Sequence, residues 1–284
     1  MRHIQSDMRE ATYWNHQANR MLNTQNITDN SWFRKYIRTR LVNICLKTIS
    51  LVNDQKCDIK ILKTDLWNEG IEPYRDVLLI LSKILNCNAT FIGMDISKIV
   101  VKAAHQRTGF AHKINSSIIN IPLRDESMDV VLDLSTIDHV SPELRHKVIN
   151  EYHRVLRPKG ILTLIVDSAE SLSFRASRTP QIKNLRRAME KLWDISMPER
   201  TKIIRMLLIR KFEILYEGCI NILQDLHRLI FSGRKARAFR ALFDKESIFR
   251  SIHRIELSRA SKAFSLFAKQ HYFICRRLDS EGSH

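Results

Sequence analysis

An aspartate closes a short apolar run in the segment FIGMDIS, at Asp95. If residues 89–97 form the second strand of a doubly wound sheet, its carboxylate lies at the carboxyl end of that strand. There it can accept hydrogen bonds from both ribose hydroxyls of a nucleotide. The same side chain could instead cap a helix over Ser97–Ala104, because a side-chain oxygen at that position satisfies free backbone amides. The residue type alone leaves both roles open.

The segments around Asp95 alternate between the patterns of strands and helices. Short apolar runs predict strands at 59–66, 89–97, 127–136, 160–168 and 271–277. Amphipathic stretches predict helices at Asp76–Leu85, Lys98–Arg107 and Pro142–Leu156, and another begins near Asp244. Strands that alternate with helices of this length favour an α/β fold with a doubly wound parallel sheet.

Three segments occur in a characteristic order: GMDIS at 93–97, IPLRDESMDVV at 121–131 and EYHRVLRPKGILTLIV at 151–166. Together they resemble the class I S-adenosylmethionine-dependent methyltransferases. The resemblance covers roughly residues 60–168 and, more weakly, 244–277. It implies a Rossmann-like sheet, S-adenosylmethionine as the cofactor, and Asp95 as its ribose ligand.

The segment after the first strand departs from the family's pattern. The family usually has an acid there, followed by a glycine-rich loop, whereas this chain has Lys63 and only one glycine up to residue 70. The resemblance implies that Asp65 and Glu69 bind the cofactor's ammonium group and that Thr64 or Asn68 binds its carboxylate. The alternative is that the loop has lost its cofactor and that the fold is kept for binding or scaffolding.

The resemblance also assigns residues to the adenine and to the transferred methyl group. Ser116 and Ser117 would give polar contacts to adenine, and Ile96 would lie beside it. The turn after the fourth strand would face the methyl group, with His139, Asp133 and Asp138 as catalytic candidates and Asp133 also near the cofactor. His139 has the intrinsic pKa of a general base, and an acid could orient it. His139 could instead only pack and cap the next helix.

The amino-acid composition argues against several other classes of protein. The 284 residues contain 47 Lys and Arg against 30 Asp and Glu, which gives a net charge of +17 and favours an anionic partner without selecting one. Five scattered cysteines without a CxxC pair argue against a zinc ribbon or a disulfide framework and suggest a reducing cytoplasm. No His spacing typical of a metal site, secretory leader or membrane-spanning run of apolar residues is found.

The positive charge is concentrated in the C-terminal part of the chain, where residues 170–284 hold 24 Lys and Arg against 12 Asp and Glu. A helix is expected over Pro198–Gly218 and a second one over Cys219–Phe231. This insert could be a plain lid over the substrate, a surface that touches an anionic membrane or receives a lipid-like substrate, or a nucleic-acid surface. Nucleic acid is the least favoured, because few aromatic residues are present for base stacking.

The sequence therefore predicts four parts. These are an N-terminal helical cap over 1–58, a methyltransferase core over 59–168 and 244–277, a basic helical insert over 169–243, and a disordered tail over 278–284. The expected activity is methyl transfer from S-adenosylmethionine to oxygen or nitrogen of a small-molecule or lipid-like acceptor, with anionic acceptors included. The alternative is a non-catalytic protein of the same fold that binds RNA or an anionic membrane through the insert. Oligomeric state is not predicted.

Overall fold

The computed structural model describes residues 2–23, 32–52, 58–72, 76–85, 89–109, 111–169, 198–221, 245–257 and 268–279. The strands are β1 (Ile59–Lys63), β2 (Ala89–Asp95), β3 (Ala111–Asn115), β4 (Met128–Leu134), β5 (Leu156–Asp167), β6 (Phe212–Ile220) and β7 (Gln270–Arg277). The helices are α1 (Arg2–Asn23), α2 (Trp32–Ile49), α3 (Trp67–Gly70), α4 (Val77–Ile84), α5 (Lys98–Arg107), α6 (Arg145–Val155), α9 (Arg200–Ile209) and α12 (Glu246–Leu257). A short 3₁₀ turn, η2 (Ile137–His139), follows β4.

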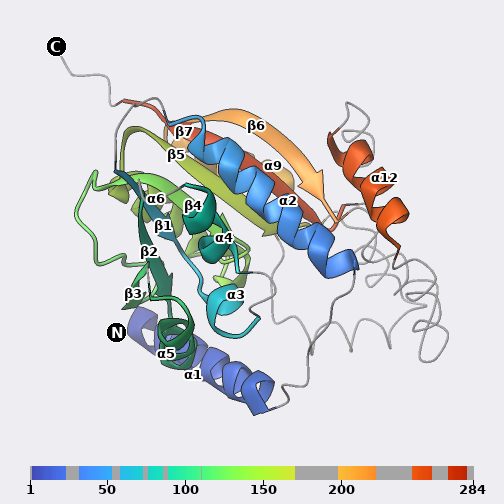
Figure 1. The fold of residues 1–284 in the computed structure, drawn as a ribbon. Coiled ribbons are helices and arrows are strands. Elements are labelled where there is room, and N and C mark those ends of the chain that lie inside the picture. The colour runs from blue at the N-terminus through green and yellow to red at the C-terminus, as the bar shows by residue number, and fades with distance from the viewer. Residues whose placement is uncertain are drawn as a thin grey trace, which may run out of the picture.

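These strands form one mixed sheet in the order β3-β2-β1-β4-β5-β7-β6 (Figure 1). The first five in sequence run parallel, whereas β7 is antiparallel to both of its neighbours, β5 and β6. The strand order reverses between β1 and β4, and ligands of doubly wound sheets bind beside such a switch point, outside the carboxyl ends of the strands. The doubly wound α/β sheet expected from the sequence is confirmed.

Side-chain alternation along the central strands divides the core into two layers. On β1 and β4, Ile61 and Val130 pack into one buried cluster with α2, α4 and α5. Their neighbours Leu62 and Val131 pack into the other cluster with α6 and α9. Because both faces of the sheet are covered, these strands are apolar on both sides, as parallel strands usually are.

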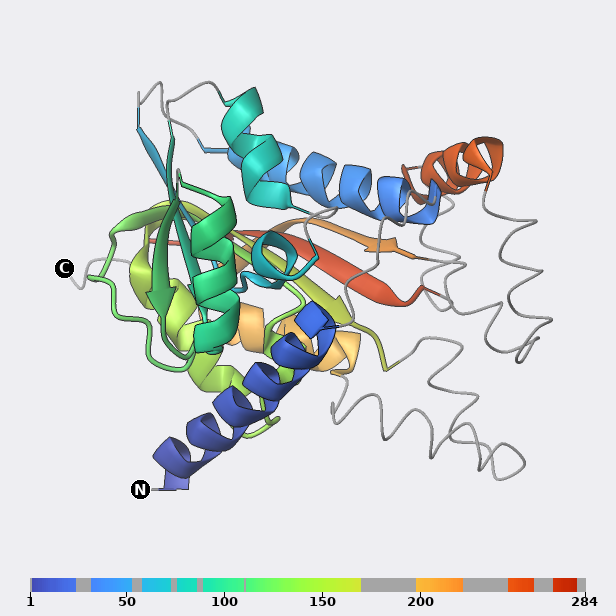
Figure 2. The same cartoon turned by 60° about the horizontal axis from the view of Figure 1, so that its bottom comes forward.

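Helix α1 crosses the carboxyl end of the sheet against α5 (Figure 2), and its Ala18 packs into the first of these clusters. Asn15 fixes its position, because its Oδ1 accepts hydrogen bonds from the Ser97 hydroxyl (2.7 Å) and the Ile99 amide (3.3 Å) at the start of α5. None of the described helices is both long and apolar enough to cross a membrane.

One glycine lets α3 approach the backbone of α5. A Cβ on Gly70 would lie 2.7 Å from the Val100 carbonyl oxygen and 3.1 Å from the Ala104 amide nitrogen, neither of which can rotate away. We expect Gly70→Ala to lower the free energy of unfolding by about 1–3 kcal/mol, as overpacking does. Urea denaturation would measure this change. Gly109→Ala is the matched control, because no atom lies within 4 Å of its added Cβ; equal losses in both variants would contradict the steric explanation.

The prediction of one helix over Pro198–Gly218 is wrong after Ile209, where α9 ends. A turn at Lys211, with φ at 57°, reverses the chain, and β6 then pairs antiparallel with β7. Residue 218 lies opposite Tyr272, whose ring fills the space that a Cβ would occupy. The expected helix from Cys219 is also wrong at its start, since Cys219 and Ile220 end β6. Part of the predicted insert over 169–243 therefore belongs to the sheet; its segments 170–197 and 222–244 lie outside the described residues.

Strand β3 is not predicted by the sequence. It has only five residues, lies at the edge of the sheet, and carries the polar His112 and Lys113, so it lacks an apolar run. Strand β5 also begins earlier than expected, at Leu156, because the segment around Pro158 is already extended. Neither difference moves the residues that end β1, β2 and β4.

Candidate functional site

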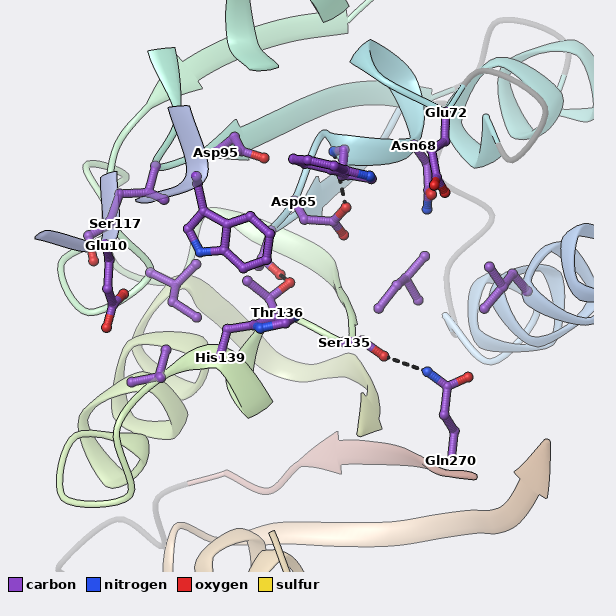
Figure 3. Close-up of a pocket in the computed structure, with 18 of the residues that line it drawn as sticks. Glu10, Asp65, Asn68, Glu72, Asp95, Ser117, Ser135, Thr136, His139 and Gln270 are labelled. Atoms are coloured by element: carbon purple, nitrogen blue, oxygen red, sulfur yellow. Dashed lines mark hydrogen bonds between the residues drawn. The ribbon is translucent and has the colours of Figure 1, made fainter. Parts of the chain in front are cut away.

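A cavity of about 350 Å³ opens where β1, β2 and β4 end (Figure 3). Helices α1 and α2 supply part of its wall, and the segment before β7 supplies another part. The lining residues are Glu10, Trp14, Ile37, Leu41, Thr64, Asp65, Trp67, Asn68, Glu72, Asp95, Ile96, Ser116, Ser117, Ile118, Leu134, Ser135, Thr136, His139, Val140, Asn221, Lys269 and Gln270.

Asp95 ends β2 and lines this cavity. Its Oδ2 accepts a hydrogen bond from the Leu66 amide (3.0 Å) and its Oδ1 accepts one from the Ser97 amide (2.8 Å). Burial raises the pKa of Asp95 to about 6, although these two amides oppose the shift. The cap of α5 is Ser97, whose hydroxyl accepts from the Val100 amide. Asp95 is therefore not the N-cap, and each carboxylate oxygen keeps capacity for a further hydrogen bond.

The residues expected at the methionine end of the cofactor separate into two groups. Thr64, Asp65 and Asn68 line the cavity, whereas Lys63 and Glu69 are fully buried and do not line it. The Thr64 hydroxyl lies 3.0 Å from that of Thr136, which links the ends of β1 and β4. The sequence places all five residues in one loop; the structure brings three of them to the cavity.

Lys63 joins two carboxylates beneath the cavity. Its ammonium nitrogen lies 2.9 Å from Asp65 Oδ2 and 3.0 Å from Glu69 Oε2, and it also donates to the Asp65 carbonyl oxygen (2.6 Å). Burial lowers the pKa of Lys63, but Asp65 and Glu69 outweigh it, so the pKa is raised above its usual value. Burial raises the pKa of Glu69 to about 7, against the opposing effect of Lys63. This cluster fixes the glycine-poor loop from inside.

Of the three catalytic candidates at the end of β4 and in the turn after it, only His139 lines the cavity. Asp133 is fully buried, where its Oδ1 accepts from the Thr136 amide (2.7 Å) and its Oδ2 from the Tyr152 hydroxyl (2.7 Å). Asp138 is also buried, and its Oδ2 accepts from the Asp167 amide (3.0 Å). Both acids shape the turn and do not reach the cavity.

The pKa shifts also separate His139 from Asp133 and Asp138. Burial raises the pKa of Asp133 to about 6, and burial together with Asp167 raises the pKa of Asp138 well above its usual value. Burial lowers the pKa of His139, so the imidazole is neutral at physiological pH and can accept a proton. Its ring lies edge-on to that of Trp14, with centroids 4.8 Å apart.

The residues expected near adenine lie together at one end of the cavity. Ile96, Ser116 and Ser117 all line it, directly beyond the paired ends of β2 and β3. The Ser116 hydroxyl donates to the Asn120 carbonyl oxygen (3.2 Å), and the Ser117 hydroxyl accepts from the Ile119 amide (3.4 Å). This end of the cavity therefore combines the apolar side chain of Ile96 with two hydroxyls that each make one hydrogen bond to the backbone.

Several lining residues were not identified from the sequence. Glu10 and Trp14 lie one helical turn apart on α1, and Ile37 and Leu41 do so on α2. That spacing puts each pair on one helix face, but nothing in the sequence says which face meets the cavity. Trp14 packs edge-on against Trp67 as well as His139, with ring centroids 5.6 Å apart in the first pair.

A second polar group at the far end of the cavity was also missed. The Gln270 amide nitrogen donates to the Ser135 hydroxyl (2.9 Å) and to Asp167 Oδ1 (2.8 Å), while its oxygen accepts from the Asn221 amide nitrogen (2.7 Å). Ser135 and Asn221 both have left-handed backbones, with φ of 76° and 64°. Strained conformations of this kind gather at functional sites, but they cannot be recognised in a sequence without glycine there.

Comparison with known proteins identifies the central part of the chain. Residues 78–164 match a family described as Methyltransferase domain. The tRNA (carboxymethyluridine(34)-5-O)-methyltransferase of Arabidopsis thaliana is 32% identical over 87 residues, which are 30% of this chain and 21% of that protein. An uncharacterized protein of Haemophilus influenzae is 29% identical over 86 residues, 29% of this chain and 34% of that protein. The matches thus span about a fifth to a third of these relatives.

Solved structures extend the likeness to most of the chain. A putative methyltransferase in complex with the Haloferax volcanii Trm112 methyltransferase activator has a TM-score of 0.54 at 13% identity, over 87% of this chain and 94% of that one. Geranyl diphosphate C-methyltransferase from Streptomyces coelicolor, in complex with Mg²⁺, geranyl diphosphate and S-adenosyl-L-homocysteine, has a TM-score of 0.54 at 10% identity, over 89% and 86%. At such identities these structures establish the fold. Residues 78–164 are thus similar to a methyltransferase domain, and most of the chain shares the fold of these solved methyltransferases.

Proposed function

We propose that the protein transfers a methyl group from S-adenosylmethionine to an oxygen or nitrogen atom of a small-molecule or lipid-like acceptor. The observation that carries the proposal is a single cavity that joins Asp95, Asp65 and His139, the polar residues beyond three adjacent strands. A nucleoside that carries an amino acid is long enough to need contacts at all three strand ends.

The chemistry of the lining residues fits this cofactor. Asp95 would accept hydrogen bonds from the ribose hydroxyls, and Asp65 would meet the ammonium group. Thr64 and Asn68 would donate to the carboxylate. S-adenosylmethionine supplies a methyl group on a good leaving group, so the protein mainly has to align the acceptor and exclude water.

His139 would take up the proton of an acceptor hydroxyl. It is neutral because burial lowers its pKa, and it lies in the cavity wall beside Trp14. Asp133 and Asp138 would act through the backbone, since they hold the turn that carries His139. We therefore keep His139 as the proposed base and assign positioning roles to the two acids.

The charge of the cavity favours a neutral or cationic acceptor over an anionic one. Among the described lining residues, Glu10, Asp65, Glu72 and Asp95 are acidic, whereas Lys269 alone is basic. Lys269 itself lies 3.7 Å from Asp167, so its charge is partly balanced. A low-dielectric cavity strengthens the repulsion of a like charge. The cavity wall thus has an excess of acidic residues, although the chain as a whole has a net charge of +17.

Apolar side chains give the acceptor's hydrocarbon part a place to bind. Ile37 and Leu41 of α2 and Leu134 of β4 all line the cavity. Such a wall can bind a small amphipathic molecule, and the proposal therefore includes a lipid-like acceptor. The thiols of Cys45, Cys219 and Cys275 are buried, which supports a reducing cytoplasm as the place of action.

The non-catalytic alternative, in which a basic insert binds RNA or an anionic membrane, is less well supported. It offers no reason for a polar cavity beyond β1, β2 and β4. The curated relative from Arabidopsis thaliana acts on tRNA by its name, but its match covers only 21% of that protein. A deletion of 180–240 would not test this alternative cleanly, because it would also remove α9 and β6.

Thermal unfolding with and without ligand tests the proposal. We expect saturating S-adenosylmethionine, and its product S-adenosylhomocysteine, each to raise the melting temperature by roughly 5 °C, since a ligand at 100 times its dissociation constant adds about 2.7 kcal/mol. ATP is the control, because it shares the adenosine but carries phosphates toward the acidic wall, and it should give no comparable shift. The absence of a shift with both cofactor forms would contradict the proposal.

A further inference from the structure

We propose that Ser135, Asn221 and Gln270 form an acceptor subsite at one end of the cavity, where they hold an uncharged hydroxyl or carboxamide group of the molecule that is methylated. This inference deepens the proposed function and rests on it, because it takes the rest of the cavity to hold the cofactor. All three residues line the cavity. Asn221 and Gln270 lie outside the matched domain over 78–164.

Ser135 lies beside the residues proposed for the methionine end of the cofactor. It directly follows β4, and the hydroxyl of the next residue, Thr136, lies 3.0 Å from that of Thr64. Figure 3 shows Ser135 and Gln270 at the end of the cavity opposite Ser117. A molecule bound at Ser135 would therefore lie next to the part of the cofactor that carries the methyl group.

Asp167 sets the direction of the hydrogen bonds in this subsite. A carboxylate only accepts hydrogen bonds, so the atom of Gln270 that lies 2.8 Å from Asp167 Oδ1 is the amide nitrogen. The same nitrogen donates to the Ser135 hydroxyl (2.9 Å). The amide oxygen of Gln270 then accepts from the Asn221 amide nitrogen (2.7 Å). The orientations of both amides thus follow from one carboxylate.

This network leaves one donor and one acceptor for a ligand. The Ser135 oxygen accepts from Gln270, so the hydroxyl proton can be donated to another group. Asn221 is 5% exposed, and within the part of the chain that the structure describes its Oδ1 has no hydrogen-bond partner. A buried acceptor without a partner costs about 1–3 kcal/mol. A donor that binds beside Asn221 would supply the missing bond after a small rotation of the amide.

The charges around the subsite favour a neutral group. Lys269 Nζ lies 3.7 Å from Asp167 Oδ2, so the two charges partly balance each other. An ammonium group would meet the charge of Lys269 and has no acceptor for the Ser135 proton. A carboxylate has no donor for Asn221. A hydroxyl or a carboxamide can both accept from Ser135 and donate to Asn221.

Apolar side chains adjoin the polar group of the subsite. Leu134 directly precedes Ser135, and Ile220 directly precedes Asn221. Both pack into one buried cluster with Ile37 of α2, which also lines the cavity. The expected acceptor is therefore amphipathic, with a hydrocarbon part against α2 and its uncharged polar group at Ser135.

Four probes with the same six-carbon chain test this assignment. Hexanamide and 1-hexanol have neutral head groups, hexanoate is an anion and hexylammonium is a cation. Their affinities would be measured by saturation-transfer NMR on protein saturated with S-adenosylhomocysteine, whose own binding is first measured by calorimetry. We expect both neutral probes to bind about fivefold more tightly than either charged probe, because one hydrogen bond contributes about 1 kcal/mol.

Two variants separate the subsite from the cofactor site. Ser135→Ala removes the donor and should weaken hexanamide binding by about fivefold, with the affinity for S-adenosylhomocysteine unchanged. Gln270→Met removes the group that orients Ser135 and Asn221, so it should abolish most of the preference for neutral over charged probes. Ser127→Ala is the matched control, because that hydroxyl donates to the Arg124 carbonyl oxygen outside the cavity. It should change neither affinity nor preference.

The possible failures are distinguishable. If the wild-type protein binds S-adenosylhomocysteine but binds hexanamide no better than the charged probes, or not at all, the acceptor subsite is wrong and the cofactor site stands. Unchanged hexanamide binding in Ser135→Ala would also contradict the subsite. If S-adenosylhomocysteine does not bind, the proposed function fails and this inference fails with it. Melting temperatures of the unliganded variants exclude a folding defect as the cause.

Discussion

Replacing Lys63 with methionine should lower the free energy of unfolding by about 3–5 kcal/mol, because it leaves the buried carboxylate of Glu69 and the partly buried carboxylate of Asp65 without their counter-ion. Lys63 is fully buried, and its ammonium group contacts both Asp65 and Glu69. Methionine keeps a similar length and fills the space, so the loss reports the charge. Urea denaturation at pH 8 would measure it.

Acid should partly reverse this loss. Without Lys63, the pKa of Glu69, already raised by burial to about 7, would rise further above its unfolded value. A carboxyl group with a raised folded pKa stabilises the protein fully below its unfolded pKa and loses that contribution as the pH rises through the folded pKa. The deficit of Lys63→Met should therefore be smaller at pH 5 than at pH 8.

Two further variants complete this test. Lys60→Met alters an exposed lysine of the same strand and should change the free energy of unfolding by no more than about 0.5 kcal/mol. The double variant Lys63→Met, Glu69→Met removes one orphaned carboxylate and should recover part of the loss. If Lys63→Met unfolds at the same urea concentration as the wild type at both pH values, the cluster does not hold the loop.

The second large effect concerns the cofactor. We expect Asp95→Asn to weaken the binding of S-adenosylhomocysteine by at least tenfold, because an amide can accept from only one of the two ribose hydroxyls and carries no charge. Calorimetry would measure the affinity. Asp129→Asn is the control: Asp129 is a buried acid at the start of β4, where it accepts from the Lys60 amide, far along the strand from the cavity. It should leave the affinity unchanged.

The same binding should depend on pH. The ionised form of Asp95 is the acceptor, and burial raises its pKa to about 6. Affinity should therefore be constant above about pH 7 and fall as the pH decreases through 6, by about tenfold for each further unit. Asp95→Asn should lack this dependence. A wild-type affinity that stays constant down to pH 5 would contradict an ionised Asp95 as the ribose ligand.

The parts of the site that could be predicted from the sequence are those fixed by local pattern. A short apolar run followed by Asp95 predicts a strand end, and a parallel sheet then brings such ends together. The expected positions of Thr64, Asp65 and His139 at the cavity follow from the same rule. Local order along the chain was sufficient here because Thr64 and Asp65 directly follow β1, and His139 lies in the short turn after β4.

The parts that could not be predicted depend on distant contacts. Trp14 and Glu10 reach the cavity only because Asn15 binds the start of α5, more than eighty residues later. Lys63 and Glu69 look like pocket residues by their type, but their mutual attraction turns both away from the cavity. A sequence lists charges without showing which of them neutralise each other.

The error over Phe212–Ile220 has a different cause. The segment FEILYEGCI is compatible with a wide apolar helix face and with the alternation of a half-buried strand, and short runs of this kind are ambiguous. Gly218 favours the strand, because glycine weakens a helix interior and here accommodates the ring of Tyr272. Pairing with β7 decides between the two, and β7 comes fifty residues later.

Because Trp14 contacts Trp67 and His139, its intrinsic fluorescence should respond to ligand binding in the cavity. Indole emission responds to a neighbouring imidazole and to any group that enters between the rings, and Trp14 meets both partners in the cavity wall. Ligand entry therefore becomes visible in the intrinsic fluorescence, without a label, on the millisecond scale of stopped-flow mixing. Because Trp14 belongs to α1 and Trp67 to α3, the signal also depends on the contact between these two helices.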